Sequence, residues 1–112
     1  MRIEDELKNG VKEYVQSAFE DEKMGRRRSA ATMYFKAIDA VCDYAIYSRL
    51  KKLPDNHTER FRVLESHFQS FYSVLNKVFP IYQQTYRSDI NQDQLEMIKD
   101  GLKKVKAFAG LE

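Results

Sequence analysis

The sequence is poor in the residues that interrupt helices. Its 112 residues include only four Gly and two Pro. An all-β fold needs many tight turns, and tight turns depend heavily on these two residue types. The composition therefore argues against an all-β fold and favours long helices joined by a few short loops.

Cysteine is scarce, and long apolar runs are absent. The one cysteine, Cys42, cannot form an internal disulfide, which is typical of a reducing, cytoplasmic setting. No apolar run approaches the roughly 20 residues of a membrane-spanning helix. The first residues, Met-Arg-Ile-Glu-Asp-Glu, lack the apolar stretch of a signal peptide. We therefore expect a cytoplasmic protein that neither crosses nor anchors in a membrane.

A large excess of one charge is also missing. Lys and Arg number 19 and Asp and Glu 17, so a net charge of +2 does not by itself indicate nucleic-acid binding. The sequence has no Gly-rich phosphate loop, no Cys/His zinc spacing and no nucleophile elbow. It also lacks the paired Glu-x-x-His motifs of di-metal bundles. We therefore expect no cofactor, no metal and no conventional small-molecule enzyme.

Apolar residues recur every three or four positions along nearly the whole chain. This spacing predicts helices over residues 3–24, 28–52, 57–87 and 92–109. The series in the third helix continues across Pro80, which predicts a kink or a split there with little change of direction. Short loops favour antiparallel neighbours. Residues 1–112 should thus form a single all-α domain, an antiparallel up-and-down four-helix bundle with its third helix kinked or split at Pro80.

Four residues mark the expected helix boundaries. Gly25 and Gly110 suit the left-handed position that ends a helix. Asn56 and Asn91 are expected N-caps, each with Glu or Gln three residues later in capping-box spacing.

The predicted second helix has an unusually wide apolar face. Its apolar set includes Ala30, Tyr34, Ala37, Ile38, Val41, Cys42, Ala45 and Ile46. Thr32, Lys36, Asp39 and Asp43 form a narrow polar strip opposite. A face this wide predicts the central helix of the bundle. It also fits a homodimer, since a second apolar face is often buried against another copy.

Three segments resemble HEPN domains. The small-residue and Tyr-rich stretch within residues 29–49 resembles their second helix. Residues 56–61, Asn-His-Thr-Glu-Arg-Phe, resemble the segment with His at the start of helix 3 in small prokaryotic members. Residues 82–89 resemble the Tyr/Arg/Asp segment before the last helix.

The resemblance spans nearly the whole chain and implies a fold and a set of functions. It implies a bundle of four or five helices that is frequently dimeric. Many such proteins resemble toxin ribonucleases of toxin–antitoxin systems, or partners of minimal nucleotidyltransferases in two-gene modules. A homodimer, an RNA and a nucleotidyltransferase-type partner are therefore the expected partners.

The catalytic pair of the nuclease members does not transfer to this chain. Those members carry Arg, roughly four to six residues and then His near the start of a late helix. In the matching segment, Arg87 is followed by Ser-Asp-Ile-Asn-Gln-Asp-Gln without a His. Our leading hypothesis is therefore a non-enzymatic or weakly active bundle that binds RNA or a partner protein.

A catalytic alternative lies in the third predicted helix. Arg62 and His67 satisfy Arg-x4-His, and Arg60 with His67 satisfies Arg-x6-His. His could transfer a proton while Arg holds a phosphate. The alternative is thus a dimeric ribonuclease that uses these residues across its interface, unless they are simply an exposed polar group. A purely structural, self-associating bundle is the third hypothesis.

Two further groups are candidates for binding RNA or phosphate. Arg26, Arg27 and Arg28 precede a helix N-terminus, where phosphate binds well, although Glu20-Asp21-Glu22 could pair with them instead. Tyr86 and Arg87 form an aromatic-basic pair that could stack a base. His57 joins these candidates through the resemblance, its plain alternative being a loop histidine bonded to backbone.

Overall fold

The protein is built from helices alone. The computed structural model describes residues 2–111, and within that range it contains five α-helices and no strand. The helices are α1 (Ile3–Lys23), α2 (Arg27–Leu50), α3 (His57–His67), α4 (Gln69–Gln84) and α5 (Gln92–Ala109). The all-α prediction is confirmed.

Three of the four predicted helices, those over residues 3–24, 28–52 and 92–109, begin and end within two residues of the predicted positions. Gly25 and Gly110 have φ of 79° and 73°, the left-handed conformation that Gly adopts without strain. Asn56 accepts a hydrogen bond from the backbone N–H three residues later. Asn91 and Gln94 form a full capping box, with bonds of 2.8 and 2.9 Å.

The predicted third helix is two helices, and the break lies at Phe68 rather than at Pro80. Phe68 has φ −139° and ψ 64°, whereas α4 continues through Pro80. The chain reverses at this one residue, so that the Phe61 and Phe79 rings lie 5.0 Å apart. The prediction of a split at Pro80 is therefore wrong. Both helices direct apolar residues to the same core. The three- to four-residue spacing of these residues therefore continues across the reversal, and from the sequence it looks like a single helix.

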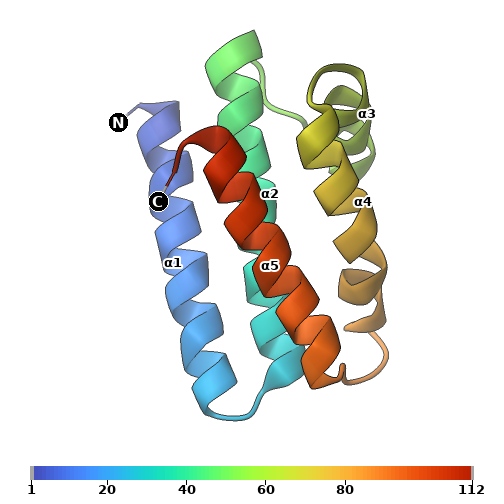
Figure 1. Cartoon of the computed structure of the whole chain (residues 1–112). Helices are drawn as coiled ribbons and strands as arrows, with labels where there is room; N and C mark the ends of the chain where they lie inside the picture. The colour runs from blue at the N-terminus through green and yellow to red at the C-terminus, as the bar shows by residue number, and fades with distance from the viewer. Residues whose placement is uncertain (1, 112) are drawn as a thin grey trace.

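The four long helices alternate in direction, whereas the short α3 runs parallel to α2 (Figure 1). The loop at residues 51–56 carries the chain back along α2 before α3 begins. As predicted, α2 is central, because it contacts each of the other four helices. Seven of the eight apolar residues predicted to face the core from this helix are buried, Cys42 among them.

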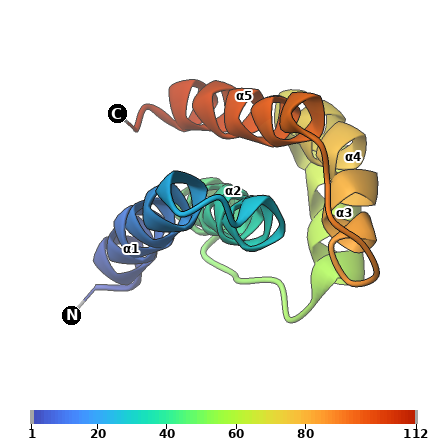
Figure 2. The same cartoon turned by 90° about the horizontal axis from the view of Figure 1, so that it is seen from below.

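The α1 helix packs against α2 alone. Within residues 2–111, no Cα atom of α1 lies within 8 Å of a Cα atom of α3, α4 or α5. Seen along the helices, the ribbons of α1 and α5 lie apart, each beside α2 (Figure 2), and the ion pair between Glu22 and Lys99 joins the two helices at 2.9 Å. No helix in this range is both long enough and apolar enough to cross a membrane.

Candidate functional site

A charge cluster of Asp39, Asp43, His57 and Arg60 lies between α2 and α3. The guanidinium of Arg60 holds Asp43 with two hydrogen bonds, Nε to Oδ1 at 2.8 Å and Nη2 to Oδ2 at 3.0 Å. Its third nitrogen, Nη1, lies 3.3 Å from Nδ1 of His57. The same Nη1 atom is 3.7 Å from Oδ1 of Asp39. Arg60 thus links the other three side chains.

Helix geometry brings these four residues together. Asp39 and Asp43 lie one turn apart on the same face of α2. His57 and Arg60 lie three residues apart at the start of α3, which the Asn56 cap fixes in place. Because α3 runs alongside α2, the two pairs face each other.

Burial sets the ionisation of the cluster. Burial raises the pKa of Asp39 to about 7, even though the charge of Arg60 opposes the shift. The Oδ1 atom of Asp39 is buried without a hydrogen-bond partner in the described part of the chain. The pKa of His57 is lowered, first by burial and then by the charge of Arg60. Near neutral pH, Asp39 is therefore partly protonated, and the environment of His57 favours its uncharged form.

An open groove adjoins the cluster and is rich in aromatic side chains. This aromatic groove is lined by His57, Phe79, Tyr82, Gln83, Gln84, Tyr86 and Arg87. The Tyr86 side chain is prominent there because the residue is 72% exposed. Its hydroxyl lies 2.8 Å from that of Tyr82, whose ring stacks on buried Phe35 at 4.2 Å between centroids.

The groove unites three binding candidates that the sequence offered separately. His57 comes from the start of α3, and Tyr86 and Arg87 follow the end of α4. The antiparallel pairing of α3 and α4 brings them together, with His57 and Tyr82 rings 5.9 Å apart. The sequence suggested each of these residues from its own chemistry. The reversal of the chain at Phe68 is what places them in the same groove.

The catalytic candidates do not share a site. Arg60 is buried and already paired with Asp43, so its guanidinium is not free to hold a phosphate. His67 lies two turns farther along α3, where it is exposed and its carbonyl accepts a bond from Arg49. Arg62 is exposed on α3.

Two of the three arginines at the start of α2 have structural partners. Arg26 pairs with Asp21, with Nη2 to Oδ1 at 2.9 Å. Arg27 donates from Nε to the Ile90 carbonyl at 2.8 Å and so ties the start of α2 to the loop before α5. The side chain of Arg28 is exposed. Local pairing therefore accounts for Arg26 and Arg27 better than phosphate binding does.

Sequence reasoning missed the role of Asp39 and Asp43, which it placed only on a polar strip of α2. The available signal was two carboxylates one turn apart on an otherwise apolar, central helix. Such carboxylates become buried and therefore require a cation from a neighbouring element. Among residues 2–111, no group of three or more His, Cys, Asp or Glu side chains is arranged to hold a metal.

Comparison with known proteins assigns no family. No family model, no curated protein and no solved structure matches the chain. The resemblance to HEPN domains therefore stays a prediction, and the site's own geometry is the main guide to function.

Proposed function

We propose that the protein is an HEPN-like helical-bundle module that binds RNA, and that the aromatic groove takes an unpaired base of a single strand. The observation that carries the proposal is the meeting of His57, Tyr86 and Arg87 in one groove. An exposed aromatic ring can stack on a base of any sequence, and a neighbouring Arg can hold the phosphate.

The Tyr86 ring is suited to stacking because it is both exposed and held. Tyr82 anchors it through the hydroxyl contact and through an edge-on ring contact at 5.4 Å. Tyr82 is itself buried and stacked on Phe35. A side chain that is fixed before binding loses little conformational entropy when a base stacks on it.

His57 adds a directional hydrogen-bond donor at the rim. Arg60 can only donate, so the 3.3 Å contact makes Nδ1 of His57 the acceptor. The neutral ring then carries its proton on Nε2, which can donate to a base edge or to a ribose hydroxyl. The lowered pKa of His57 keeps this tautomer available at neutral pH.

The resemblance extends this proposal to partners. We include in the proposal that the protein forms a homodimer and is cytoplasmic, and that it acts with a nucleotidyltransferase-type partner in a two-gene module. The central α2, buried along most of its length, fits the helix that organises such a bundle.

Binding of labelled single-stranded and duplex RNA at two salt concentrations tests the proposal. We expect Tyr86→Ala to weaken single-strand binding by about 5- to 100-fold, because stacking on one base is lost. Tyr86→Phe should bind nearly as wild type does. Arg87→Ala should lower the salt dependence by roughly one phosphate contact. Lys77→Ala, an exposed change elsewhere on α4, is the matched control. Equal RNA binding by wild type and Tyr86→Ala would refute the proposal that the aromatic groove binds RNA.

The same RNA distinguishes the other hypotheses. Cleavage that disappears in His67→Ala would replace our proposal with a ribonuclease built on Arg60 or Arg62 and His67. Absence of both cleavage and binding at low salt would favour a purely structural bundle.

A further inference from the structure

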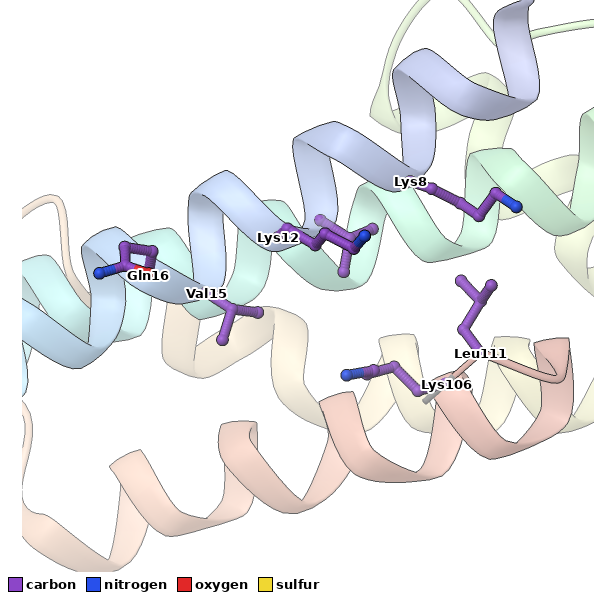
Figure 3. Close-up of a pocket in the computed structure, with 7 residues that line it drawn as sticks. Lys8, Lys12, Val15, Gln16, Lys106 and Leu111 are labelled. Carbon is purple, nitrogen blue, oxygen red and sulfur yellow. The ribbon is translucent and has the colours of Figure 1, made fainter.

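A second groove lies between α1 and α5, away from the aromatic groove. Both helices pack on α2, and a hollow of about 400 Å3 lies between them. A second hollow, of about 410 Å3, adjoins it along α5 and Tyr34 of α2. Lys106 and Leu111 line both hollows, so the two form one continuous α1–α5 groove. Side chains of Val15, Lys106 and Leu111 point into the space between the helices (Figure 3).

The floor of the α1–α5 groove is apolar. Val11 and Leu102 form its deepest part, at 4% and 7% exposed. Val15 and Leu111 are only partly buried and lie nearer the opening. Partly exposed aliphatic side chains of this kind gain stability when another apolar surface covers them.

The rim of the groove is basic. It carries Lys8 and Lys12 from α1 and Lys103 and Lys106 from α5, and no Asp or Glu among residues 2–111 lines either hollow. Within residues 2–111, no carboxylate lies within 4 Å of these four ammonium groups. Lys99, at one end of the groove, differs because it is bonded to Glu22 at 2.9 Å.

We propose that the α1–α5 groove docks an amphipathic helix of a partner protein, one whose apolar stripe is flanked by Asp and Glu. The apolar floor would cover the stripe, and the lysines on both sides would face the acidic flanks. The groove extends along α5 from Lys99 to Ala107, which corresponds to roughly 12 Å, or about two helical turns, and Leu111 lies just beyond the end of the helix.

The apolar floor favours a helix over a nucleic-acid strand. Lysines alone would attract a phosphate backbone, but a backbone gains nothing from Val15 and Leu111. A helix laid between two helices that diverge from a third can pack against both by side-chain interdigitation. This inference uses neither His57 nor Tyr86, so it is independent of RNA binding.

Two designed peptides of about 18 residues test the docking site. They share one helical stripe of Leu, and their flanking positions are all Glu in one and all Lys in the other. We expect the wild-type protein to bind the acidic peptide, more weakly at high salt, and not the basic one. Anisotropy of a labelled peptide measures this directly.

Charge reversal supplies the decisive variants. Lys12→Glu/Lys106→Glu should weaken acidic-peptide binding on the order of tenfold or more and should create binding of the basic peptide. Lys52→Glu/Lys77→Glu, at exposed positions outside the groove, is the matched control and should change little. Circular dichroism of each variant confirms that it folds. Tyr86→Ala should bind the acidic peptide as wild type does.

Three results would overturn the docking proposal. The first is equal binding of both peptides by the wild type, and the second is unchanged binding by the reversed variant. The third is a wild-type dimer in sedimentation equilibrium that Val15→Asp converts to a folded monomer, because a second copy would then cover the groove.

Discussion

Two carboxylates in this molecule, Asp21 and Asp39, have pKa values shifted in opposite directions. In the turn cluster between α1 and α2, Asp21 accepts bonds from Ser29 at 2.6 Å and from Arg26 at 3.0 Å. The hydrogen bond from Ser29 is the main cause of the lowered pKa of Asp21, and burial opposes it. In the charge cluster between α2 and α3, burial instead raises the pKa of Asp39 to about 7.

Burial disfavours the charged form of both Asp39 and Asp21, and only Asp21 has hydrogen bonds strong enough to outweigh it. Asp39 has Arg60 3.7 Å away, but Arg60 directs its strong hydrogen bonds to Asp43. Glu22 in the turn cluster is penalised by burial, yet bonds from Lys99 and Tyr34 lower its pKa overall. A part-buried carboxylate stays ionised where hydrogen-bond donors point at it. A nearby positive charge that makes no good hydrogen bond does not have the same effect.

Removing Arg60 should have the largest effect. Arg60→Met leaves Asp43 and Asp39 part-buried without their cation, so we expect the free energy of unfolding to fall by about 3–5 kcal/mol. Urea unfolding followed by circular dichroism measures it. Arg62→Met, at an exposed position two residues farther along α3, should change stability by less than about 0.5 kcal/mol. If Arg60→Met/Asp43→Leu is as unstable as the single variant, the loss does not come from the stranded carboxylates.

Asp39→Asn should remove one contribution to the pH dependence of the free energy of unfolding. The folded pKa of Asp39 lies above its unfolded value, so the folded protein keeps a proton that the unfolded chain loses. Its contribution to stability therefore falls as pH rises from about 4 to about 7. His57, with a lowered pKa, contributes in the opposite direction, so each variant must be compared with wild type.

The free energy of unfolding of Asp39→Asn minus that of wild type should rise by roughly 2–3 kcal/mol as the pH is raised from 5 to 8. Denaturant unfolding at several pH values measures this difference. A constant difference across that range would show that Asp39 is ionised throughout.

Ser29→Ala probes the turn cluster and should cost about 1 kcal/mol at pH 7, because Asp21 loses its closest donor. The pKa of Asp21 is lowered, so this stabilisation is present above its unfolded value and is lost as pH falls below about 4. Thermal unfolding at pH 7 and pH 3 should therefore show a smaller loss at the lower pH. Ser48→Ala, exposed in α2, is the control.

Lys99→Met should have the smallest effect. Its ammonium joins Glu22 of α1 to α5, but both side chains are partly exposed, at 34% and 23%. We expect a loss of about 0.5 kcal/mol that high salt largely removes. Unfolding with and without about 1 M salt measures it. A loss that does not depend on salt would point to the contact of Lys99 with the Tyr34 ring instead, where Nζ lies 6.0 Å from the ring centroid.

Local signals predicted the helices well, and the lack of a local signal explains the main error. Gly and Asn at the helix ends have fixed chemical roles, so Gly25, Asn56 and Asn91 could be read directly from the sequence. Phe68 carries no such signal, because neither Gly nor Pro marks the reversal. Its position follows from how α3 packs back on α4, which is a property of the tertiary fold.

The candidate site was predictable residue by residue but not as an arrangement. His57, Tyr86 and Arg87 were each suggested by their own chemistry, and only the fold shows that they line one groove. Arg60 was paired with His67 from spacing along one helix. Its partner in the structure is Asp43 of α2, and spacing within a helix carries no information about a facing helix.

The short α3 has a consequence for local unfolding. It contains 11 residues, of which only Arg60 and Leu64 are buried, and it is tied to α4 by a single residue. Segments with so little burial open well below the free energy of global unfolding. We expect amide hydrogens of α3 to exchange faster than those of α2, and RNA to slow them, because the groove needs His57 in place. Binding at the groove and the closing of α3 would then be one equilibrium, so a helix that opens easily would be the part of the molecule that responds to ligand.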